Sequence, residues 1–159
     1  MIGLFQSPPF HHPVLGELKR SRGYWRGSMA LAGEEFVPLA LCGNRNEPDP
    51  RAVALAQGVP STFNSWRASI EGALFQHYAP YAEAVAAGGS PSPSESVPTI
   101  STSSQVWPHV SFAFVSVTPL ASELTTELGL TVAWDEEHTL GARFQAGKFL
   151  ELNGSVLPP

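Results

Sequence analysis

The sequence has few charged residues. Asp, Glu, Lys and Arg make up 14% of its 159 residues, whereas about 25% is typical of a globular chain. The formal net charge is −5, so the chain lacks the basic surface with which proteins displace counterions from nucleic acids. We therefore expect no nucleic-acid partner, while a basic protein partner is compatible with this charge.

Cysteines and long apolar runs are also scarce. Cys42 is the only cysteine, so no internal disulfide can form, which is typical of a reducing compartment. Apolar runs such as "VSFAFVSV" (110–117) are far shorter than the roughly 20 residues that cross a membrane, and the N-terminus lacks the basic and apolar regions of a signal peptide. We expect a cytoplasmic protein that does not cross a membrane.

The common motifs of enzymes and cofactor sites are missing as well. The sequence contains no glycine-rich phosphate loop, no HExxH, no GxSxG and no CxxC. Cys42 ends an apolar segment and has no histidine near it in the sequence, so we interpret it as a small buried residue and not as a nucleophile. These absences favour a non-enzymatic role and predict no cofactor.

What the sequence does contain is enough apolar material for one core. Hydrophobic residues make up 43% of the chain, and the length suits a single domain over residues 1–159. The Ser- and Pro-rich segment 88–105 predicts a flexible loop. Only 54 residues follow it, too few for an independent core without disulfides or metal, so we place the loop inside one domain.

The pattern along the chain predicts strands, then helices, then strands. Asp49 to Gly58 has the capping residues of a short helix, and Ser61 opens a longer helix with an apolar stripe that reaches Val85 and that Pro80 should kink or end. Pro38 marks its strand as an edge or bulged strand. The fold class is therefore α+β, with a mainly antiparallel sheet of N-terminal and C-terminal strands packed against one long and one short central helix. The expected strands are Val14–Lys19, Tyr24–Leu31, Glu35–Cys42, Val110–Thr118, Glu127–Trp134, Thr139–Gln145 and Phe149–Asn153.

One short stretch concentrates the residues that could carry chemistry. In "VAWDEEHTLGARF" (132–144) a tryptophan precedes three acids and a histidine. Alternation along the flanking strands directs Trp134 and Phe144 to the core and leaves the polar residues at the connection. The candidate binding residues are Trp134, Asp135, Glu136, Glu137 and His138.

Three interpretations of this stretch stay open. Asp135 can accept backbone N–H groups and hold a turn together, with a glutamate pairing to His138 or to an arginine. The three acids can instead form a negative surface that receives Lys or Arg from a partner. Finally, Asp135, Glu137 and His138 could ligate a metal ion, with His109 as a possible further ligand.

A second histidine falls beside the apolar stripe of the longer predicted helix. His77 is expected to be a hydrogen-bonded residue at the boundary of the core. His109 precedes a predicted strand and has no obvious partner in the sequence. The sequence alone therefore assigns neither histidine to a site.

The block "WDEEHTLGARFQAGKFLELNGSV" (134–156) resembles the C-terminal signature of a family of small uncharacterised bacterial proteins. The signature is W-D-x-E-H, in which Glu136 occupies the variable position. The segments "GYWRGSMAL" (23–31) and "VWPHVSFAFVSV" (106–117) are similar to other parts of that family. The resemblance supplies no established activity that could be carried over to this chain. Some members look like immunity or accessory proteins of toxin systems, which implies a protein partner.

The leading functional hypothesis is a non-enzymatic bacterial protein that binds another protein, such as a basic toxin that it neutralises. One alternative is a metal-dependent hydrolase that uses Asp135, Glu137 and His138 near His109. A second alternative is a structural or scaffolding subunit.

Overall fold

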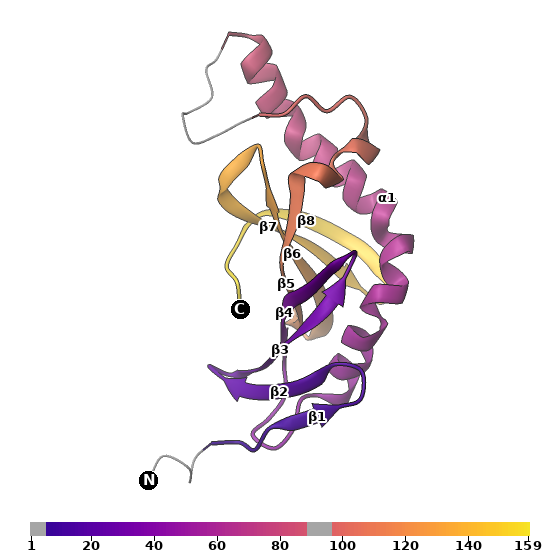
Figure 1. Ribbon diagram of the computed structural model, residues 1–159, viewed down its shortest axis with the longest axis vertical. Coiled ribbons are helices and arrows are strands. Elements are labelled where there is room, and N and C mark those ends of the chain that lie inside the picture. The colour runs from indigo at the N-terminus through magenta and orange to yellow at the C-terminus, as the bar shows by residue number, and fades with distance from the viewer. Residues whose placement is uncertain (1–5, 89–96) are drawn as a thin grey trace.

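The strands predicted at the two ends of the chain form one sheet. The computed structural model describes residues 6–88 and 97–159 (Figure 1). The sheet has eight strands, and their order in space is their order in the chain. All neighbouring strands are antiparallel except β4 and β5, which are parallel. The strands are β1 (Phe10–His12), β2 (Gly16–Ser21), β3 (Tyr24–Leu31), β4 (Glu34–Leu41), β5 (Val110–Leu120), β6 (Glu123–Val132), β7 (Asp135–Gln145) and β8 (Lys148–Val156).

Tight turns set this order. Four of the strand connections have both central residues at positive φ, between 49° and 88°. This conformation belongs to the turns that match the twist of a two-stranded hairpin. In three of the four a glycine takes the second position, which explains why the sequence signals were clear. The four pairs are Arg22–Gly23, Ala32–Gly33, Ala121–Ser122 and Ala146–Gly147.

The parallel pair β4 and β5 requires a crossover, which a single helix supplies. Helix α1 (Pro50–Ala86) crosses one face of the sheet (Figure 1). The pairing of β4 with β5 begins at Leu39, so Pro38 lies just outside it, where a missing N–H is tolerated. Within the described residues, no helix combines the length and apolar character needed to cross a membrane.

The prediction of two separate helices is wrong in one respect, because α1 runs without a break through Gly58 and Pro80. Its start is as predicted: the Asp49 carboxylate accepts the Arg51 N–H at 2.8 Å and Pro50 takes the first position. The Gly58 carbonyl, next to Pro60, accepts hydrogen bonds from the hydroxyls of Ser61 and Thr62. A glycine or proline inside a helix costs about 1–3 kcal/mol. Burial of the continuous apolar stripe of α1 outweighs that cost.

This stripe and the sheet form the core. Nine side chains of α1 are buried, from Ala52 in the first turn to Tyr78 in the last quarter of the helix. Trp66 stacks on Phe144 of β7 with ring centres 4.0 Å apart. The buried residues of α1 are Ala52, Val53, Ala56, Val59, Phe63, Trp66, Ile70, Leu74 and Tyr78. Opposite them, the sheet contributes Leu39, Leu41, Val115, Val117, Leu128, Leu130, Leu140, Ala142 and Phe144.

The chain returns from α1 to the sheet along the helix. The Tyr78 hydroxyl donates to the Pro98 carbonyl at 2.6 Å and accepts the Ile100 N–H at 3.1 Å. Two short 3-10 helices follow, η2 (Ser103–Gln105) and η3 (Trp107–His109). Of the predicted flexible loop 88–105, residues 97–105 thus contact α1, and residues 89–96 lie outside the described residues.

The continuity of α1 can be tested at Gly58. A Cβ atom there would have the Thr62 hydroxyl oxygen, 4.0 Å away, as its nearest neighbour outside the adjacent backbone. Gly58→Ala should therefore raise the free energy of unfolding by about 0.5–1 kcal/mol, measured by urea denaturation. If Gly58 instead ended a separate short helix in the left-handed conformation, alanine would destabilise the protein.

Gly129→Ala is the matched control. A Cβ atom at Gly129 would lie 2.2 Å from the Phe114 ring, so the same substitution should lower stability at that position.

Candidate recognition site at the β6–β7 corner

The candidate residues lie at a corner where β6 turns into β7. Val132 pairs with Asp135 across the turn formed by Ala133 and Trp134. Neither turn residue has a positive φ, so this connection differs from the four hairpins whose central residues have positive φ. The Ala133 N–H donates to the His109 carbonyl at 3.0 Å, which ties the corner to η3. A backbone hydrogen bond to η3 therefore supports this corner.

Trp134 anchors the corner in the core. Its side chain is fully buried, and its ring lies 5.4 Å from the Tyr78 ring in an edge-on arrangement. The indole N–H donates to Nδ1 of His77 at 2.9 Å. A buried indole N–H without an acceptor would cost about 1–3 kcal/mol, so His77 makes burial of Trp134 possible. This agrees with the prediction of a hydrogen-bonded histidine at the core boundary.

Asp135 is buried and fully engaged. Its exposed fraction is 4%. One carboxylate oxygen, Oδ1, accepts the Glu137 N–H at 3.2 Å, and the other, Oδ2, accepts the Tyr81 hydroxyl at 2.9 Å. Nδ1 of His138 lies 3.0 Å from both oxygens. This is the turn-holding arrangement of the first interpretation, with a tyrosine of α1 added to it.

The hydrogen bonds determine where the imidazole protons reside. An ionised carboxylate only accepts, so His138 carries a proton on Nδ1 and directs Nε2 away from Asp135. His77 accepts at Nδ1, so its neutral form carries the proton on Nε2, which lies 3.9 Å from Oδ2 of Asp135. Asp135 thus lies between two imidazole rings.

Burial and hydrogen bonding shift two pKa values in this cluster. Burial lowers the pKa of His77, and the proximity of His138 lowers it further, against the opposing effect of Asp135. Burial alone would raise the pKa of Asp135. The hydrogen bonds from Tyr81 and His138, the charge of His138 and the Glu137 N–H together outweigh burial and lower it.

Glu136 and Glu137 have a different environment. Both side chains are exposed, and across residues 6–88 and 97–159 no hydrogen bond or ion pair engages either carboxylate. Glu136 also borders a shallow groove between η3 and the corner. The groove is lined by Pro108, His109, Ser111, Thr131, Val132, Ala133, Asp135 and Glu136.

The metal interpretation finds no assembled ligand set. Within the described part of the chain, no three His, Cys, Asp or Glu side chains are placed to share an ion. His109 lines the groove, but Asp135 is occupied by Tyr81 and His138 and Glu137 is exposed to solvent. A zinc site needs three or four protein ligands that converge on one point. The predicted set of Asp135, Glu137, His138 and His109 does not form such a site.

The Asp135–His138 pair resembles the base half of a catalytic triad without its nucleophile. Among the described residues, no hydroxyl or thiol hydrogen-bonds to the outer nitrogen of His138. Cys42 is only half-buried, not fully buried as expected, and its pKa is raised first by burial and then by nearby Asp49, the opposite of thiol activation. The arrangement is suited to holding the corner and to presenting polar groups at its rim.

Sequence reasoning missed the contribution of α1 to this site. Tyr81 and His77 are 54 and 57 residues away from their partners in the corner. Their spacing of four places both on one helix face, which is a visible signal. Nothing in the sequence pairs that face with the W-D-x-E-H block, however.

The chain was compared with known proteins. A family model described as a domain of unknown function (DUF6985) matches residues 14–156. No curated protein and no solved structure matches the chain. The match includes the whole corner and the part of α1 that contacts it.

Replacing Asp135 with alanine should destabilise the fold. The Tyr81 hydroxyl, the His138 ring and the Glu137 N–H would all lose their acceptor, so we expect a loss of about 2–4 kcal/mol in urea denaturation. Glu136→Ala is the control and should change stability by less than about 0.5 kcal/mol. Equal stability of the two variants would contradict a structural role for Asp135.

Stability should also fall when the pH drops below about 6.5, the ordinary histidine pKa. Because the pKa of His77 is lowered in the folded state, the unfolded chain binds the proton first, and the stabilisation present above that pH is lost as the pH falls. His77→Asn keeps an acceptor for the Trp134 N–H but cannot titrate. Its unfolding free energy should therefore change less between pH 7 and pH 5 than that of the unmodified protein. Identical pH profiles would contradict this assignment.

Proposed function

This chain belongs to the family described as a domain of unknown function (DUF6985), and we propose that it acts by binding another protein through the acidic rim of the β6–β7 corner. We define the acidic rim as Glu136, Glu137 and the outer nitrogen of His138. One observation carries the proposal. The Asp135 side chain is buried and already hydrogen-bonded within the protein. The side chains of Glu136 and Glu137, which follow it, are exposed and, among the described residues, unpaired.

The chemistry of the rim favours a basic segment of the partner. Two adjacent carboxylates can receive Lys or Arg, and Nε2 of His138, which is not used by Asp135, adds a polar contact. The net charge of −5 would favour the approach of a positively charged partner at low salt. The rim is held by Trp134 and Asp135, so binding requires little further ordering of the chain, which preserves affinity.

The identity of the partner is a finer proposal. The W-D-x-E-H block resembles that of small bacterial proteins, some of which look like immunity or accessory proteins of toxin systems. We therefore propose a basic toxin as the partner and the bacterial cytoplasm as the place of action. The metal-dependent hydrolase has less support, because the corner does not bring a ligand set together in the described residues.

The test is co-expression of this chain with the product of the neighbouring reading frame, followed by affinity measurement on the purified pair. The double variant Glu136→Lys, Glu137→Lys should weaken binding by about tenfold or more, with a larger effect at low salt. It should also fail to relieve any toxicity of the partner.

Glu47→Lys, Glu123→Lys is the matched control. Both side chains are exposed and lie at the opposite end of the sheet, Glu47 after β4 and Glu123 at the start of β6, and the net charge changes equally. Equal loss of binding in the two double variants would show that only the overall charge matters. Absence of any complex, with a stable homo-oligomer in its place, would favour a scaffolding role.

A further inference from the structure

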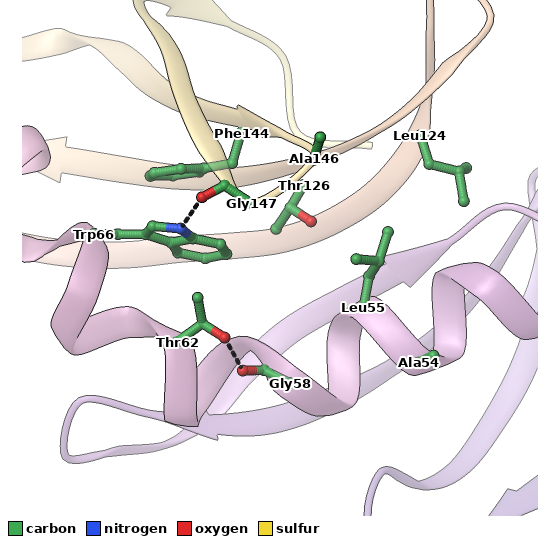
Figure 2. A pocket seen from close by; sticks show the side chains of 10 residues that line it. All are labelled: Ala54, Leu55, Gly58, Thr62, Trp66, Leu124, Thr126, Phe144, Ala146 and Gly147. Carbon is green, nitrogen blue, oxygen red and sulfur yellow. Dashed lines mark hydrogen bonds between the residues drawn. The ribbon is translucent and has the colours of Figure 1, made fainter.

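A hollow lies at the other end of β7, away from the acidic rim. It opens between the first half of α1 and the hairpin that joins β7 to β8 (Figure 2). Its volume is about 140 Å³. We call it the helix–hairpin slot. Its lining residues are Ala54, Leu55, Gly58, Thr62, Trp66, Leu124, Thr126, Phe144, Ala146 and Gly147.

The walls of the slot are apolar and firmly held. Trp66 and Phe144 stack at 4.0 Å with an interplanar angle of 18°. The Trp66 indole N–H donates to the Gly147 carbonyl at 3.1 Å, which fixes the ring against the hairpin (Figure 2). Leu55 and Leu124 add aliphatic surface. No charged side chain lines the slot, so an ion entering it would lose hydration without compensation.

One polar group in the slot has no partner. Thr126 is 4% exposed, and among the described residues nothing hydrogen-bonds to its hydroxyl. Thr62, also in the lining, differs because its hydroxyl donates to the Gly58 carbonyl at 2.8 Å (Figure 2). No side-chain nitrogen or oxygen of the described residues is both fully enclosed and unpaired, so the Thr126 hydroxyl is reachable from the slot, where a ligand atom can pair with it.

Gly58 keeps the slot open. Glycine inside a helix costs about 1 kcal/mol relative to alanine, and no close contact demands glycine here, since the nearest neighbour of a Cβ would be 4.0 Å away. Any larger side chain on this face of α1 would project into the space that Gly58 lines. A ligand in the slot would therefore account for glycine at this position in spite of its cost to the helix.

We propose that the helix–hairpin slot binds a neutral ring of about phenol size, whose polar atom hydrogen-bonds to Thr126. An apolar cavity of about 150 Å³ accepts benzene, so the volume suits one six-membered ring. The free hydroxyl adds a requirement for one donor or acceptor on that ring. This ring can belong to a free phenolic molecule or to a tyrosine side chain of a partner, and the two sources share one chemistry.

The probes are phenol and toluene, titrated to millimolar concentration into the full chain while the indole N–H signal of Trp66 is followed by NMR. Both should shift that signal, and phenol should bind more tightly. Thr126→Val removes the hydroxyl at nearly constant volume and should weaken phenol binding by roughly five- to tenfold, while toluene binding stays within about twofold. Gly58→Leu should abolish both.

Two results would overturn the proposal: no change at Trp66 with either probe, or an equal loss of phenol and toluene binding in Thr126→Val. If Gly58→Leu folds poorly, Thr126→Val still decides the test. N-acetyltyrosinamide distinguishes the sources, because its binding indicates a peptide-borne ring and its exclusion indicates a free phenol. The Glu136→Lys, Glu137→Lys variant should bind phenol normally, so the proposals for the slot and for the acidic rim are tested independently.

Discussion

Burial of the apolar stripe of α1 on one face of the sheet is the interaction on which the rest of the structure depends. The stripe continues past Gly58, Pro60 and Pro80, residues that end or kink helices in isolation. The contact also joins the N-terminal and C-terminal halves of the sheet, because β4 and β5 are parallel and only a crossover can connect them. The same helix therefore provides the crossover between β4 and β5 and buries the core face of the sheet.

The same contact positions both candidate sites. Toward the C-terminal end of α1, His77 and Tyr81 meet the β6–β7 corner and satisfy Trp134 and Asp135. Toward the N-terminal end, Trp66 and its neighbours meet the β7–β8 hairpin and enclose the helix–hairpin slot (Figure 2). The corner is polar and closed around a buried carboxylate, whereas the slot is apolar and retains an unpaired hydroxyl.

The corner also shows how a buried charge is tolerated. Desolvation of a carboxylate is costly, and Asp135 offsets it with three hydrogen-bond partners and a second imidazole 3.9 Å away. Those partners come from both α1 and β7, so the carboxylate links the helix to the corner. Glu136 and Glu137 stay hydrated and are left for recognition.

The sequence by itself determined seven of the eight strands in outline, the three glycine-containing hairpin turns and the start of the helix, because these depend on local backbone preferences and on the alternation of apolar residues. It also identified the 134–138 block and offered a turn-holding Asp135 as one of three interpretations, since an Asp at a turn accepts nearby N–H groups. Only the tertiary structure decided that two predicted helices are one and that His77 and Tyr81 complete the corner. It also left the Thr126 hydroxyl facing the helix–hairpin slot. Those outcomes depend on contacts between residues more than 50 positions apart, whose energies no local pattern contains.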